Sequence, residues 1–108
     1  MDKELLKGSI DLLLLSLISR EDQYGYSLAK KIKVLSNEVY EIGEGTLYPA
    51  LKRLESKKAI ESYWGGNGSG GRRKYYRITK QGLRMLEDKV EGWHAMHRLV
   101  STVITGEK

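Results

Sequence analysis

Seven consecutive residues, five of them glycine, separate two segments that are rich in aromatic and β-branched side chains. The seven are Gly65-Gly66-Asn67-Gly68-Ser69-Gly70-Gly71, and the flanking segments are Ile60 to Trp64 and Arg72 to Ile78. No regular element tolerates so much glycine, whereas a connection between two strands does. The sequence therefore predicts a β-hairpin with a flexible tip, and other regular structure has to lie before and after it.

Two helices are expected in the first third of the chain. Residues Ser9 to Ser19 are dominated by Leu and Ile, which predicts a largely buried helix, and the polar segment Arg20 to Gly25 connects it to the next one. The second helix has apolar positions at helical spacing and a basic outer face. The apolar positions are Leu28, Ile32 and Leu35, and the basic ones are Lys30, Lys31 and Lys33. We expect Ser36 to Gly43 to form the turn that follows.

A third helix is predicted over Glu44 to Lys58. One stripe is apolar, and the other is exposed to solvent. The apolar stripe holds Leu47, Leu51 and Leu54, and the outer one holds Gly45, Tyr48, Pro49, Lys52 and Ser56. Pro49 is tolerated in the first turn if Thr46 is the N-cap, and it removes one hydrogen bond if Gly43 is the N-cap. We prefer Gly43.

The last segment predicts a long helix that begins after Thr79 as N-cap. Its apolar residues alternate between spacings of three and four, which is a heptad seam. The seam consists of Leu83, Leu86, Val90, Trp93, His97, Val100 and Ile104, and a second stripe consists of Met96, Leu99 and Val103. Leaving this surface in water would cost several kcal/mol at about 25 cal/mol per Å² of apolar area. We therefore expect a dimer interface here; the alternative is intramolecular packing on the first helix.

The order helix, helix, turn, helix, hairpin is that of a winged helix-turn-helix. The expected fold is mainly α with a β-hairpin wing and a C-terminal dimerisation helix. We place the DNA-binding domain at residues 1–80 and the dimerisation helix at residues 81–108. Length is consistent with this division, because 108 residues suffice for one modest core.

Positive charge is concentrated in the middle of the chain. Residues 20–80 hold 13 Lys and Arg against 7 Asp and Glu, while the flanks hold 6 against 7. A regional surplus suits a polyanion such as DNA, although a solvated basic face gives the same pattern. Cysteine is absent, and the longest apolar run is Leu12 to Leu15. We therefore expect a cytoplasmic protein without disulfides, signal peptide or membrane segment.

Two surfaces are suited to duplex DNA. On the third helix, Tyr48 and Lys52 can donate hydrogen bonds in a major groove, and Gly45 lets the backbone come close. On the wing, glycines permit close approach to phosphates, and a basic cluster supplies charge. That cluster is Arg72, Arg73 and Lys74.

Three motifs make the chain resemble the PadR family of transcription regulators. They are Tyr24-Gly25-Tyr26, Gly45-Thr46-Leu47-Tyr48-Pro49-Ala50-Leu51 with Arg53-Leu54-Glu55, and Gly71-Arg72-Arg73-Lys74-Tyr75-Tyr76. The single tail helix is similar to the compact subfamily that includes multidrug-responsive repressors. The wing departs from the family pattern in its glycine-rich tip.

The resemblance implies a homodimer that binds double-stranded DNA with an inverted repeat. In the family the tail helix packs on the first helix and on the tail of the other subunit. The helix holding Thr46, Tyr48, Pro49 and Lys52 would enter the major groove, with Arg53 as a further DNA contact. Residues Tyr24 and Tyr26 would touch phosphates or pack beneath that helix. We expect a two-fold axis to separate the recognition helices by about 34 Å, one turn of DNA.

Trp93 has two interpretations. In multidrug-responsive relatives, a tryptophan at the matching position lines a pore between subunits and stacks on planar aromatic small molecules. This makes Trp93 a candidate effector-binding residue. The alternative is a tryptophan that fills the dimer interface, since the ring suits either role.

An enzyme is not expected. His94 and His97 are the only histidines, and no acid, base and nucleophile have a recognisable spacing. Glu91, His94 and His97 could share a metal, but no further ligand completes a set, so we predict neither a metal site nor a cofactor. The hairpin glycines match G-x-G-x-x-G without opening a helix that could hold a pyrophosphate.

Three functions remain open at the level of sequence. The first is a homodimeric repressor released by a small-molecule or stress signal. The second is a dimeric adaptor that binds another protein through its apolar tail. The third is a protein that senses or sequesters a small molecule without specific DNA binding.

Overall fold

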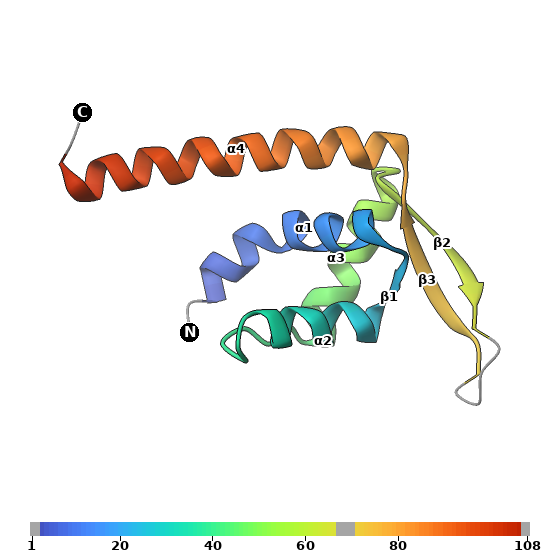
Figure 1. Cartoon of the computed structure of the whole chain (residues 1–108). Coiled ribbons are helices and arrows are strands. Elements are labelled where there is room, and N and C mark those ends of the chain that lie inside the picture. The colour runs from blue at the N-terminus through green and yellow to red at the C-terminus, as the bar shows by residue number, and fades with distance from the viewer. Residues whose placement is uncertain (1–2, 67–70, 107–108) are drawn as a thin grey trace.

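A computed structural model gives the fold, and it describes residues 3–66 and 71–106. Within those ranges the chain forms four helices and a three-stranded antiparallel sheet (Figure 1). The elements in order are α1 (Lys3–Arg20), β1 (Gln23–Tyr24), α2 (Gly25–Leu35), α3 (Glu44–Ser56), β2 (Ile60–Gly65), β3 (Arg73–Ile78) and α4 (Lys80–Thr105). The predicted winged helix-turn-helix with a C-terminal helix is confirmed.

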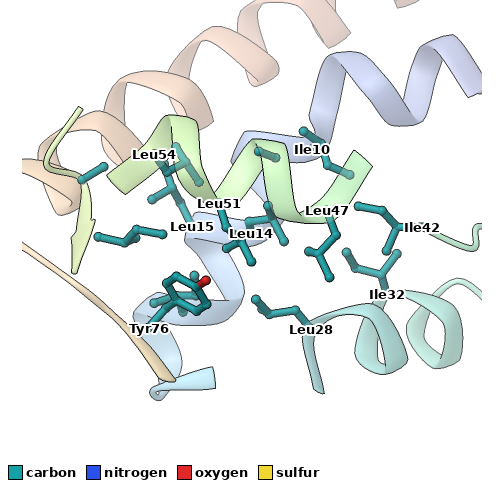
Figure 2. Close-up of a cluster of buried hydrophobic side chains, with 14 residues drawn as sticks. Ile10, Leu14, Leu15, Leu28, Ile32, Ile42, Leu47, Leu51, Leu54 and Tyr76 are labelled. Carbon is teal, nitrogen blue, oxygen red and sulfur yellow. The ribbon is translucent and has the colours of Figure 1, made fainter. Parts of the chain in front are cut away.

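The core lies where α1, α2, α3 and the sheet meet, and Figure 2 shows its side chains converging between these elements. Most of the residues predicted to be buried are buried. The largest completely buried side chains are Leu14, Leu15, Ile18, Leu28, Leu51, Leu54 and Ile60. The exception is Leu35, which is 72% exposed because α2 ends there and its last turn leaves the core. Helix α1 also begins earlier than predicted, at Lys3.

The turn between α2 and α3 is compact because its backbone adopts left-handed conformations. Asn37 and Glu38 have φ of 53° and 64°. The N–H of Glu38 donates to the carbonyl of Lys33 at 2.8 Å, and the Ser36 hydroxyl accepts from the N–H of Tyr40 at 3.0 Å. These bonds satisfy groups that the end of α2 leaves free and direct the chain into α3.

Helix α3 begins after Gly43, the N-cap that we preferred from the sequence. Pro49 is therefore the sixth residue of the helix, and it cannot donate to the carbonyl of Gly45. Its fixed φ suits a helix, so the cost is confined to that bond and to crowding of the preceding turn.

The sheet contains one strand that the sequence did not predict. Its order is β1-β3-β2, with Gln23 opposite Tyr76 and Tyr24 opposite Tyr75. Strand β1 has only two residues, too few to show an alternating pattern. The Gln23 side chain is 3% exposed, and its amide nitrogen donates to the carbonyl of Leu17 at 3.4 Å. Strand β1 thereby fixes the wing to the end of α1.

The start of α4 is held against the turn that joins α3 to β2. Thr79 is the N-cap, as predicted, and its Oγ1 accepts from the N–H of Gly82 at 2.9 Å. The N–H of Thr79 donates to the carbonyl of Ala59 at 3.0 Å. The first half of α4 packs on α1, and the helix then continues past it as a long arm (Figure 1). None of the described helices is long and apolar enough to cross a membrane.

Candidate DNA-binding surface

The outer face of α3 is exposed along its length, while its inner face is anchored in the core. The exposed residues are Gly45, Thr46, Tyr48, Pro49, Lys52, Arg53 and Ser56. The inner residues are Leu47, Ala50, Leu51 and Leu54, each no more than 2% exposed. The helix is thus held by its buried face and presents the other face to solvent.

Tyr48 extends from α3 over the first residue of α2. A Cβ added at Gly25 would lie 2.5 Å from the Tyr48 hydroxyl oxygen and 2.8 Å from its Cζ. Only glycine leaves room for the ring at this point. Tyr48 remains 46% exposed, so its phenol is positioned by α2 and still accessible from solvent.

We expect Gly25→Ala to lower the free energy of unfolding by up to about 1 kcal/mol, because the methyl group displaces the half-exposed Tyr48 ring toward solvent. The matched control is Gly45→Ala, since a Cβ there meets nothing within 4 Å. The control should be neutral or stabilising by up to about 1 kcal/mol through helix propensity. Urea unfolding of both variants measures the difference, and equal stability of the two would refute the packing argument.

Arg53 and Thr46 lie toward one edge of this face. The Arg53 guanidinium donates to Asp11 of α1 at 2.6 Å, with the two side chains 47% and 18% exposed. This ion pair connects α3 to α1. A contact from Arg53 to DNA would compete with it, and that contact stays a prediction.

The three basic residues of the wing are exposed but lie against different aromatic rings. The guanidinium of Arg73 is 4.6 Å from the ring of Tyr24, and that of Arg72 is 5.6 Å from the ring of Trp64. Lys74 Nζ is 5.7 Å from the ring of Tyr76. Because side chains alternate along a strand, Arg73 and Lys74 point to opposite faces of the sheet. The remaining tip, residues 67–70, lies outside the described residues.

A row of tyrosines crosses the sheet on the Arg73 side. Tyr75 contacts Tyr24 edge-on at 5.5 Å and stacks on Tyr63 at 5.6 Å, and Tyr26 stacks beside Tyr24 at 6.4 Å. Tyr63 donates a hydrogen bond to Asp22, which raises the pKa of Tyr63. The row ties the wing to the start of α2. Tyr24 and Tyr26 were candidate site residues from the sequence, whereas Tyr63 and Tyr75 on the strands were not.

Helix α4 carries apolar residues along its whole length, and other elements of the chain cover only part of them. In its first half Leu86 and Val90 are partly buried near α1. Beyond Val90 the apolar residues of the seam and of the second stripe are exposed. These are Trp93, Met96, Leu99, Val100, Val103 and Ile104, with exposed fractions of 45–78%. Leu83 and His97 of the predicted seam are also exposed.

Trp93 stands at the point where coverage by α1 ends. His97 stacks on its ring at 5.1 Å, nearly parallel, and His94 meets it edge-on at 5.3 Å. Trp93 also borders an open, mainly apolar groove of about 1240 Å³ between α1 and α2. Other apolar residues along the groove are Leu5, Leu12, Leu13, Val34 and Leu35.

Comparison with known proteins agrees with this architecture. Residues 14–88 match the family described as Transcriptional regulator PadR-like family. The chain therefore belongs to the PadR-like family of transcriptional regulators. It is 37% identical over 103 residues to an uncharacterized protein of Lysinibacillus sphaericus, covering 95% of this chain and 94% of that one.

Two solved structures are similar to this chain to different degrees. A transcriptional regulator from Clostridium thermocellum is 37% identical and superposes with a TM-score of 0.84 over 92% of this chain and 96% of its own. Bacillus subtilis PadR, solved in complex with operator DNA, is 22% identical with a TM-score of 0.66 over 75% of this chain and 46% of its own. The second resemblance is one of fold.

Proposed function

We propose that this protein is a homodimeric DNA-binding repressor that a small-molecule or stress signal releases from its operator. The observation that carries the proposal is the outer face of α3, where Gly45, Tyr48 and Lys52 lie exposed on a helix anchored in the core. The solved complex of Bacillus subtilis PadR with operator DNA supports a DNA-binding role for this fold.

In the proposed complex α3 enters the major groove. Lys52 donates to base acceptors or phosphates, and the Tyr48 hydroxyl donates from a ring whose position α2 fixes. Gly45 has open space around its missing side chain, which lets the helix approach the DNA. Arg72, Arg73 and Lys74 of the wing, with Tyr24 and Tyr26, bind phosphates beside it.

The second copy of the chain is the proposed occupant of the uncovered tail. The exposed stripe of α4 and the apolar groove between α1 and α2 are two unpartnered surfaces on one chain. With a two-fold axis, α4 of each subunit would pack on α1 and α4 of the partner subunit. Both surfaces would then be buried on both subunits. The seam residues Leu83, Leu86, Val90, Trp93, His97, Val100 and Ile104 are the proposed interface.

Signal release would act on this interface. Trp93 offers a flat ring beside the apolar groove, already stacked on His97, which suits a planar aromatic ligand. A ligand bound between the two α4 helices would alter the angle or spacing of the two winged helix-turn-helix domains. Such a ligand would lower the affinity for the operator only to the extent that it binds the altered dimer more tightly than the DNA-binding dimer.

The DNA-binding surface is tested by replacing Lys52 with alanine. We expect binding to a preferred duplex to weaken about tenfold, since a good contact to a base edge contributes roughly 1–3 kcal/mol. The control is Arg98→Ala, which removes the same charge from an exposed position of α4. Fluorescence anisotropy at fixed salt measures both, and wild-type affinity in Lys52→Ala would contradict the proposed recognition face.

A further inference from the structure

Asp11 is a partly buried carboxylate that lies on α1 beside α3. Its side chain is 18% exposed, and Nη2 of Arg53 donates to its Oδ1 at 2.6 Å. Within the described residues no other group bonds to this carboxylate. The three other ion pairs of those residues have both side chains at least 38% exposed. Asp11 is therefore the acidic partner with the least solvent, and removing Arg53 would leave its charge poorly compensated.

Arg53 lies at the edge of α3 that faces α1. Lys52 shares the outer face with Tyr48, four residues earlier, whereas Arg53 leaves the helix about 100° away from Lys52. Its guanidinium is bonded to Asp11, within the range of a charged hydrogen bond. A bond from Arg53 to a DNA phosphate would therefore come at the expense of the bond to Asp11.

The ion pair adds direction to a contact that is otherwise apolar. Ile10 and Leu14 of α1 belong to the same core cluster as Leu51 of α3 (Figure 2). Burial of apolar surface has no preferred direction, whereas a charged hydrogen bond has a preferred distance and angle. Asp11 and Arg53 lie outside this cluster, so their bond restrains rotation of α3 about the apolar contact.

The ion pair also lies beside the tail helix. Asp11 and Arg53 border a small open cleft of about 450 Å³, and Lys89, Trp93 and Met96 of α4 border the same cleft. Helix α1 packs on both α3 and α4. The orientation of α3 relative to α4 therefore depends on how α3 is held against α1.

We propose that Asp11 is a positioning residue for DNA binding, which acts through Arg53 to hold α3 at a fixed angle to α1. This inference rests on the proposed function, because it requires two copies of α3 to bind one operator. In the proposed dimer α1 contacts α4 of both subunits, so this angle sets the direction from one α3 to the other. Asp11 thereby makes the dimer selective for the spacing of the half-sites, and Arg53 bonds to α1 and not to the DNA backbone.

The first test is Asp11→Asn, measured by fluorescence anisotropy on the duplex that the wild-type chain prefers. By charge alone, removing an acidic side chain strengthens binding to DNA. We expect about fivefold weaker binding, because a neutral amide holds the guanidinium less firmly. Arg53→Gln should weaken binding to a similar extent, and the double variant should be no weaker than either single one, since all three lack the same ion pair.

The salt dependence separates positioning from a phosphate contact. If Arg53 bound a phosphate, Arg53→Gln would lower the slope of log K against log salt by about one per subunit. We expect its slope to match that of the wild-type chain, because Arg53 is neutralised by Asp11 and not by DNA.

Reversing the ion pair is the rescue experiment. Asp11→Arg alone and Arg53→Asp alone each place like charges side by side, and we expect each to bind about tenfold more weakly. The double variant restores a directional pair, so it should bind within about threefold of the wild-type chain. A phosphate contact by Arg53 could not be rescued in this way, because the double variant has a carboxylate on α3.

A further arm varies the distance between the half-sites. One base pair more or less rotates one half-site by about 35° relative to the other. The wild-type dimer should bind both altered duplexes about tenfold more weakly, and Asp11→Asn should discriminate less, because its α3 can turn. The matched control is Glu61→Gln, which removes the acidic partner from the exposed pair with Arg77. This control should keep the affinity and the spacing preference of the wild-type chain.

The outcomes separate the inference from the proposed function. If the wild-type chain binds no duplex specifically, both are overturned. If it does, and Asp11→Asn binds equally or more tightly with the same spacing preference, only the inference is overturned. A shallower salt slope in Arg53→Gln, without recovery in the reversed pair, would assign Arg53 to a phosphate and would also overturn the inference alone. Every variant is measured at a temperature at which urea unfolding shows it to be folded.

Discussion

Gly82→Ala is expected to lower the free energy of unfolding by about 3 kcal/mol, a large part of the roughly 5–15 kcal/mol that holds a small domain folded. A Cβ at this position would lie 2.0 Å from the carbonyl oxygen of Ala59 and 2.8 Å from Ile78 Cγ1. That carbonyl cannot move freely, because it accepts hydrogen bonds from the N–H and the hydroxyl of Thr79. Relieving the clash would therefore loosen the start of α4.

The matched control lies on the same helix. Gly92→Ala adds the same methyl group where nothing lies within 4 Å, so it should be neutral or stabilising by up to about 1 kcal/mol. Thermal unfolding at one protein concentration should place Gly82→Ala roughly 10–20 °C below wild type. Equal melting temperatures for the two variants would show that α4 is not docked as described.

Val100→Asp is expected to abolish the proposed dimer and to weaken binding to the proposed operator by a factor of about 100 or more. Val100 lies on the exposed stripe of α4, and a carboxylate there would be buried without a partner in the proposed interface. Affinity falls because, in a dimer, binding of one winged helix-turn-helix domain places the second at a high effective concentration near its half-site. A monomer lacks this effect.

The control for this variant is Thr102→Asp, which places the same charge two residues away at another exposed position of the helix. Sedimentation equilibrium gives the oligomeric state, and anisotropy gives the affinity. We expect Thr102→Asp to remain dimeric. A dimeric Val100→Asp with wild-type affinity would refute the proposed interface.

The parts of the fold that depend on local chemistry were predictable. Thr79 and Gly43 could be identified as caps because a cap is a property of a few neighbouring residues. Leu51 and Leu54 could be assigned to the core because helical spacing fixes the face on which they lie. The hairpin could be predicted because aromatic and β-branched segments flank the glycine-rich connection on both sides.

Contacts between distant segments were not predictable. The packing of Tyr48 on Gly25, of Gly82 on Ala59 and of Arg53 on Asp11 joins elements whose approach depends on the whole core. Strand β1 could not be predicted from the sequence, because its two residues are too few to show a periodic pattern. The exposure of Trp64 could not be inferred either, since an aromatic strand residue is equally typical of a buried face.

We propose that two winged helix-turn-helix domains, related by a two-fold axis, bind one operator. This proposal is tested most directly by selecting duplexes from a random-sequence pool with the purified wild-type protein and sequencing those bound. We expect an inverted repeat whose half-site centres lie one helical turn apart, about 10–10.5 base pairs, or a multiple of it. Enrichment of no sequence, or of a single asymmetric site, would contradict it.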